Sequence, residues 1–101
     1  MEFETLYLVI IKKGPAWTPD ETPELDQLQT AHLAHIDHLR EEGLLIAAGP
    51  VDDGSYLRGI SVLRVDSLTK AVELVEADPS VLAGRLTVEV HPWDVPTGVF
   101  S

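Results

Sequence analysis

The chain has 101 residues, 45% of them hydrophobic, which is enough for one domain with a modest core. Its formal net charge is −10 with the histidines neutral, and its seven Lys and Arg residues are scattered, so neither nucleic acid nor a membrane surface is an expected partner. The absence of cysteine excludes disulfides, thiolate metal ligands and a cysteine nucleophile.

The first half of the chain predicts a strand, a helix and a second strand. Leu6–Ile11 is an almost unbroken apolar run, as expected for a strand that is buried on both faces. A Pro-rich loop over 14–22 ends at Thr22, a typical helix N-cap, and the helix is expected over 23–42. A second apolar strand is expected over 44–51.

The second half predicts a hairpin, a helix and a final strand. Residues 52–55 (Asp-Asp-Gly-Ser) have the turn chemistry of a hairpin that leads into a third strand over 56–65. A helix capped by Ser67 should end at Asp78-Pro79. Alternating apolar residues from Leu86 predict a fourth strand that ends near Pro92.

This order of elements predicts an α+β, ferredoxin-like β-α-β-β-α-β fold, with a four-stranded antiparallel sheet and both helices on one face. The chain should be a single domain over 1–101, with a core at about 3–93 and an irregular tail over 94–101. The other face of the sheet is left bare although its strands are apolar. We therefore expect a homodimer that packs two such faces together.

His32 is the main candidate for chemistry, because it occupies the middle of the apolar stripe of the first helix. The stripe has a helical spacing and is formed by Leu25, Leu28, Ile36 and Leu39. Three interpretations are open: a general acid/base or substrate-binding group in a pocket, a core histidine with satisfied nitrogens, and a metal ligand. His35 lies at the edge of the stripe, where it could bind substrate, and His38 should be exposed.

Asp78 is the candidate partner of His32. It follows Leu74 and Val75 by four and three residues, which turns it toward the buried side of the second helix. A carboxylate there could fix the tautomer of the imidazole and stabilise its protonated form. The alternative is that Asp78-Pro79 only terminates the helix.

Two further segments are candidates for binding a ligand. Gly49-Pro50 ends the second strand and is either a structural turn or a place where a ligand can approach the backbone. Trp17, in the Pro-rich loop, is a candidate wall of a pocket.

Several of these residues together resemble the YciI-like (YCII-related) proteins, over roughly Leu6 to Trp93. In the first half the resemblance is carried by His32-Leu33-Ala34-His35, Leu39, Gly43-Leu44 and Ala48-Gly49-Pro50. In the second half it is carried by Ala77-Asp78-Pro79, Gly84 and Pro92-Trp93.

The resemblance implies a dimeric α/β barrel and an active-site His-Asp pair, which correspond here to His32 and Asp78. It also suggests small cyclic or aromatic substrates. We therefore expect a small cytoplasmic enzyme of lyase or isomerase type, without a cofactor or a metal, in which His32 moves a proton. The alternative is a non-catalytic module that binds a metabolite or another protein and keeps His32 for its core.

Overall fold

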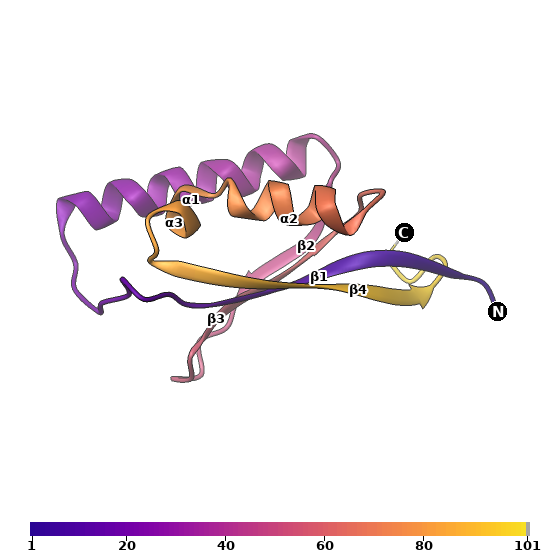
Figure 1. Ribbon diagram of the computed structural model, residues 1–101, viewed down its shortest axis with the longest axis horizontal. Coiled ribbons are helices and arrows are strands. Elements are labelled where there is room, and N and C mark those ends of the chain that lie inside the picture. Colours follow the sequence, from indigo (N-terminus) through magenta and orange to yellow (C-terminus); the bar gives the residue numbers. More distant parts are fainter. Residues whose placement is uncertain (101) are drawn as a thin grey trace.

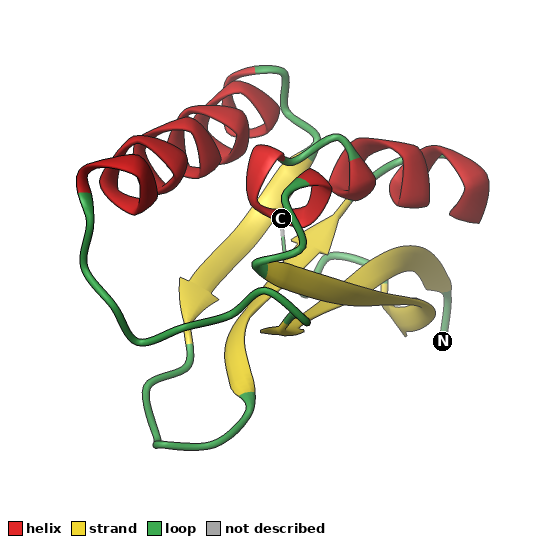
Figure 2. Ribbon diagram, turned by 60° about the vertical axis from the view of Figure 1, so that its left-hand side comes forward, coloured by secondary structure: helices red, strands yellow, loops and turns green. Residues whose placement is uncertain are grey.

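The computed structural model describes residues 1–100, in which helices cover one face of a four-stranded sheet (Figures 1 and 2). Its elements are, in order, β1 (Phe3–Lys13), α1 (Pro23–Glu41), β2 (Leu45–Pro50), β3 (Leu57–Leu63), α2 (Leu68–Glu76), α3 (Pro79–Leu82) and β4 (Leu86–Pro96). The strand order is β2-β3-β1-β4, and all neighbouring strands are antiparallel. The predicted ferredoxin-like α+β fold is confirmed.

Helix α1 has the predicted ends. The Thr22 hydroxyl accepts a hydrogen bond from the Leu25 N–H at 3.2 Å, and Pro23 occupies the first turn, where its missing N–H costs nothing. Gly43 follows the last turn with a φ of 76°, a backbone conformation that glycine adopts without strain. None of the helices within residues 1–100 has the length and apolar character needed to cross a bilayer.

The two faces of the sheet carry separate apolar clusters. Tyr7 and Val9 of β1 pack toward the helices, in a core that also contains Leu39, Leu63, Ala71 and Val75. The opposite face has a second cluster, formed by Leu6, Val62 and Val95 with Leu8, Ile46, Ala47 and Phe100 packed against it. Both faces of these strands thus carry apolar side chains, as the sequence predicts.

Strand β4 is longer than the sequence suggests, and this corrects the expected tail. It continues to Pro96, with Pro92 opposite Tyr7 of β1. Because β4 is an edge strand, Pro92 can lack an N–H without breaking a ladder between two neighbours. The chain then turns, and Phe100 packs edge-on against Trp93, with 5.9 Å between the ring centroids. Residues 94–96 are therefore strand, and Ser101 lies outside the described residues.

A bulge interrupts the pairing of β1 with β3. Ile11 pairs with Gly59 but the next residue, Lys12, pairs with Leu57, so that Arg58 has no partner on β1. Such a bulge breaks the strict alternation of side chains and re-aims the extra residue.

The end of α2 differs from the expectation. Helix α2 ends at Glu76, and Asp78 is the N-cap of the short helix α3 rather than the last residue of the preceding helix.

Candidate functional site

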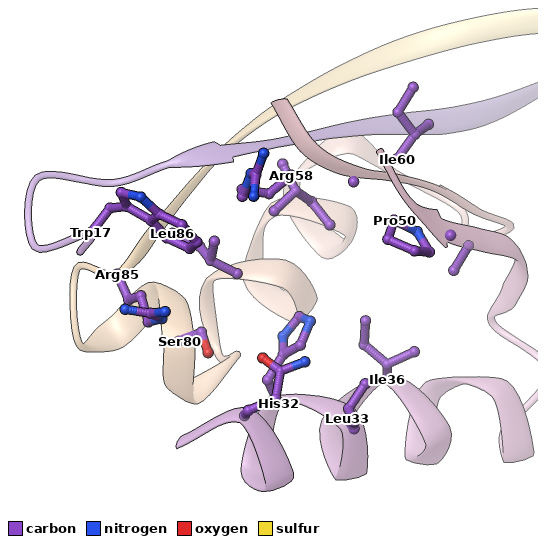
Figure 3. Close-up of a pocket in the computed structure, with 15 residues that line it drawn as sticks. Trp17, His32, Leu33, Ile36, Pro50, Arg58, Ile60, Ser80, Arg85 and Leu86 are labelled. Carbon is purple, nitrogen blue, oxygen red and sulfur yellow. The ribbon is translucent and has the colours of Figure 1, made fainter. Parts of the chain in front are cut away.

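A cavity of about 450 Å³ lies between α1 and the sheet (Figure 3). Its wall consists of Ile11, Trp17, Gln29, His32, Leu33, Ile36, Ala48, Gly49, Pro50, Arg58, Gly59, Ile60, Ser80, Arg85 and Leu86. Most of these side chains are apolar, and none is acidic. Pockets of this size and composition hold small organic molecules, which a few polar groups orient.

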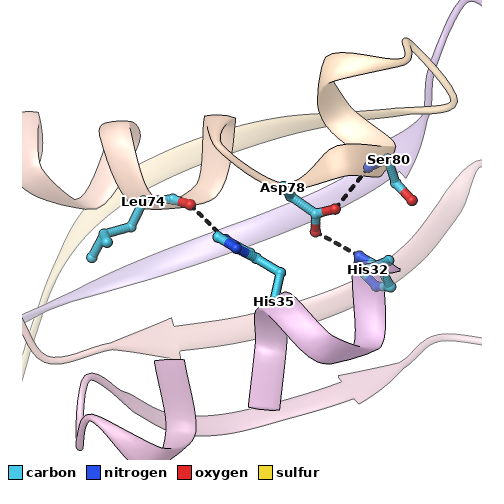
Figure 4. Close-up of polar contacts among 5 residues, drawn as sticks. All are labelled: His32, His35, Leu74, Asp78 and Ser80. Carbon is cyan, nitrogen blue, oxygen red and sulfur yellow. Dashed lines mark hydrogen bonds and ion pairs between the residues drawn. The ribbon is translucent and has the colours of Figure 1, made fainter. Parts of the chain in front are cut away.

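His32, which lines this cavity, forms a hydrogen bond with Asp78 (Figure 4). The distance between His32 Nδ1 and Asp78 Oδ2 is 2.5 Å, and the two side chains are only 12% and 9% exposed. The imidazole of His32 points into the cavity (Figure 3). No residue within 1–100 forms a hydrogen bond with its other nitrogen, Nε2.

The carboxylate of Asp78 is itself held in place by the start of α3. Its Oδ1 accepts a hydrogen bond from the Ser80 N–H at 2.8 Å, which leaves Oδ2 for the imidazole. An ionised carboxylate can only accept, so the proton of the shared bond belongs to Nδ1. Nε2 then carries the lone pair that faces the cavity, which is the arrangement of a histidine general base.

His35, which the sequence suggested as a substrate-binding residue, does not line this cavity. Its Nε2 donates a hydrogen bond to the Leu74 carbonyl at 2.8 Å, and this contact joins α1 to α2 (Figure 4). The histidine that was expected to bind substrate therefore acts between two helices. His38 is exposed, as predicted, and pairs with Glu42.

The interpretation of His32 as a metal ligand receives no support from the geometry. His32 and His35 direct a nitrogen to different partners, Asp78 and Leu74. Within residues 1–100 there is no group of three or more His, Asp or Glu side chains that could hold a metal ion.

Trp17, Gly49 and Pro50 line the cavity, as the sequence suggested. At Gly49 a Cβ atom would meet no other atom within 4 Å, so the glycine is not required there by protein packing. Its lack of a side chain leaves room beside the cavity, which agrees with the idea that a ligand approaches this backbone.

Other lining residues were not anticipated, chiefly Ser80, Arg58 and Arg85. A signal for Ser80 existed: it follows Asp78 by two residues, the spacing at which an aspartate caps a backbone N–H. Arg58 had no such signal, since its direction depends on the bulge in β3.

Known proteins that are similar to this chain include a sequence relative and two solved structures. The uncharacterized protein YjpA of Bacillus subtilis (strain 168) is 34% identical over 62 residues, which are 61% of this chain and 71% of that protein. Muconolactone isomerase superposes with a TM-score of 0.70 at 21% identity, over 95% of this chain and 96% of the other.

The second structure is 5-chloro-2-hydroxyhydroquinone dehydrochlorinase (TftG) of Burkholderia phenoliruptrix AC1100, in complex with 2,5-dihydroxybenzoquinone. It has a TM-score of 0.58 at 22% identity, and the match covers 87% of this chain and 92% of that one. Both structures have the dimeric α/β barrel fold, and at these identities the likeness concerns the fold alone.

The family model of the YCII-related domain matches residues 5–94, nearly the whole chain. This match agrees with the resemblance carried by the histidine motif of α1 and the Gly-Pro end of β2. The chain belongs to the YCII-related domain family.

Proposed function

We propose that this protein is a small cytoplasmic enzyme of lyase or isomerase type, which uses His32 and Asp78 to transfer a proton on a small cyclic or aromatic molecule without a cofactor. One observation carries the proposal. A partly buried imidazole, held at Nδ1 by a buried carboxylate, lines an apolar cavity, and its Nε2 has no partner within residues 1–100.

The proposed reaction follows from that geometry. Nε2 of His32 removes a proton from a carbon of the substrate, and the Asp78 carboxylate stabilises the imidazolium that forms. In an isomerisation, the imidazolium returns the proton to a different carbon as the double bond moves. In an elimination, the C–H electron pair forms a new double bond while the leaving group departs with its own electron pair.

The two solved structures suggest where a search for substrates should begin. Their names concern a lactone isomerase and a dehydrochlorinase of a hydroxylated ring, which are both reactions of small cyclic molecules. Lactones and hydroxyquinones are therefore the first compounds to screen by thermal shift.

Replacement of His32 by alanine tests the proposal. Compounds that bind are incubated in D2O, and the exchange of their acidic C–H protons and their turnover are followed by NMR. We expect His32→Ala to lower the rate by roughly 10²–10⁴-fold, the usual contribution of a positioned proton-transfer group.

The matched control is His38→Ala, which makes the same substitution on the exposed side of the same helix and should keep the wild-type rate. A folded His32→Ala variant with the rate of the wild type would refute the mechanism. Saturable binding with neither exchange nor turnover would favour the alternative, a non-catalytic metabolite-binding module.

A further inference from the structure

Three basic side chains surround Trp17 at one end of the cavity. The guanidinium carbons of Arg85 and Arg58 lie 4.4 Å and 5.1 Å from the centre of the Trp17 ring, and Nζ of Lys13 lies 5.5 Å from it. Trp17 and both arginines line the cavity and lie away from the α1 residues of the wall (Figure 3). This is a local concentration of positive charge in a chain with a net charge of −10.

Within residues 1–100, neither arginine has an acidic partner, whereas three other basic side chains have one. Lys12, Arg40 and Arg64 form ion pairs with carboxylates. Within residues 1–100, no carboxylate lies within 4.0 Å of Arg58 or Arg85.

The carboxylate of Asp53, in the turn before β3, is not a substitute partner for Arg58. Its pKa is lowered mainly by hydrogen bonds from the side chain and then from the backbone N–H of Ser55. The charge of Arg58 is the smallest of the causes.

Both guanidinium groups retain unused donors. Arg85 donates through Nη1 to the Thr18 carbonyl at 3.2 Å, and within residues 1–100 its Nε and Nη2 have no acceptor. These two groups form the edge of a guanidinium that binds a carboxylate with two parallel hydrogen bonds. Arg58 uses Nε and Nη2 for the carbonyls of Leu57 and Ser55, which leaves Nη1.

The local backbone is shaped to hold these side chains at the cavity. Arg58 is the bulged residue of β3, which on strict alternation would share the open face of the sheet with Val62. The loop before Trp17 is docked on the two residues that precede β4, since the N–H groups of Gly14 and Ala16 donate to the Arg85 and Gly84 carbonyls, both at 2.8 Å.

Gly14 permits this docking, because a Cβ there would lie 2.3 Å from the Gly84 carbonyl oxygen. The close approach of the two backbones fixes Trp17 beside Arg85. The Trp17 ring and the guanidinium groups of Arg58 and Arg85 are therefore held together by the local backbone.

We propose that Arg85, assisted by Arg58 and Trp17, binds a carboxylate group of the ligand. The substrate is then a small carboxylic acid, whose apolar or cyclic body extends from Arg85 toward His32 (Figure 3). This inference rests on the proposed function, since it assigns the class of molecule that the same cavity accepts. Arg85 supplies the two-donor edge, Arg58 a further donor and positive charge, and Trp17 holds both guanidinium planes by cation–π contact.

Binding of benzoate and of benzamide, its neutral analogue of similar shape, tests this subsite on the full-length protein. Both are titrated at low ionic strength and followed by the backbone NMR signals of residues that line the cavity. We expect benzoate to bind at least about 10-fold more tightly than benzamide. Equal affinities, or shifts that lie outside the cavity, would overturn the inference.

The variants Arg85→Gln and Arg58→Gln then assign the effect. Arg85→Gln should weaken benzoate binding by about 10- to 100-fold, Arg58→Gln should weaken it less, and neither should change the affinity for benzamide. The matched control is Arg40→Gln, an exposed arginine paired with Asp37, which should bind both as the wild type does. Benzoate binding by Arg85→Gln at the affinity of the wild type would contradict the proposal.

Two outcomes separate this inference from the proposed function. His32→Ala should still bind benzoate through Arg85, so binding without any proton exchange would remove the enzymatic proposal and keep the carboxylate subsite. Turnover of neutral compounds, with no preference for benzoate over benzamide, would keep the enzymatic proposal and remove the carboxylate subsite. If Arg85→Gln does not fold, Arg85→Lys keeps the charge and should still bind benzoate less tightly, because a lysine cannot form the two parallel bonds.

Discussion

At the scale of single residues, the cost of keeping His32 on an apolar stripe is the main argument for its use. A hydrogen bond to a charged group contributes about 1.5–3 kcal/mol, but two matched apolar side chains at such positions are often as stable or more stable. The His32–Asp78 pair is therefore not required for packing. Its position at a cavity gives the pair a role that a leucine could not fill.

The sequence argument that identified His32 is stronger than the one that identified Asp78. Helical periodicity identified His32 directly, because a polar residue stands out among leucines at fixed spacing. Asp78 was identified as the last residue of a helix, whereas it caps the next one and reaches His32 from there. The distance between the two could not be predicted, since it depends on how α3 packs against α1.

Arg58 shows a further limit at this scale. Arg58 lies at the bulge between β3 and β1, and it lines the cavity. A bulge depends on the pairing of two strands that are far apart in sequence, which the local pattern of β3 does not contain.

At the scale of elements, His35 joins the two long helices. The Leu74 carbonyl lies in the last turn of α2, where carbonyl groups lack an intrahelical partner, and the Asp78 N–H donates to Val75 instead. His35→Leu should therefore lower the free energy of unfolding by about 1–3 kcal/mol, because it leaves a partly buried acceptor unpaired. Urea denaturation measures this change.

The same replacement at His38 is the control for that prediction. His38 is exposed and pairs with Glu42, so His38→Leu should change the stability by less than about 1 kcal/mol. Equal losses for the two variants would argue against a link between α1 and α2 through His35.

The elements themselves were largely predictable, because their ends carry local signals. Thr22, Ser67 and Gly43 mark helix ends by side-chain or backbone chemistry that needs no tertiary contact. Strand β4 was the exception. Proline normally ends a strand, and its tolerance at Pro92 depends on β4 lying at the edge of the sheet, which is a property of the whole fold.

At the scale of the whole molecule, we expect a homodimer because the face of the sheet opposite the helices is apolar. Leu8 and Ile10 are only partly buried there, and Ile60 and Trp93 are 40% and 39% exposed. We expect sedimentation equilibrium at micromolar concentration to give the mass of a dimer, since an apolar surface of this kind is rare on a monomer.

A charge on that face tests the mode of association. Ile10 alternates with Val9 and Ile11, which pack toward the helices, so Ile10→Lys places a charge on the open face and should give a monomer. Leu82→Lys, on the exposed side of α3, is the control and should remain dimeric. A wild-type chain that is monomeric under these conditions would refute the expected dimer.

The central claim is that Asp78 holds His32 with its proton on Nδ1 and its lone pair toward the cavity. The ¹⁵N resonances of the His32 imidazole test this most directly, since they distinguish a protonated from an unprotonated ring nitrogen. We predict that neutral His32 is protonated at Nδ1 in the wild type, and that Asp78→Asn moves the proton to Nε2, because the asparagine amide can donate to Nδ1. A wild-type His32 protonated at Nε2 would contradict the account.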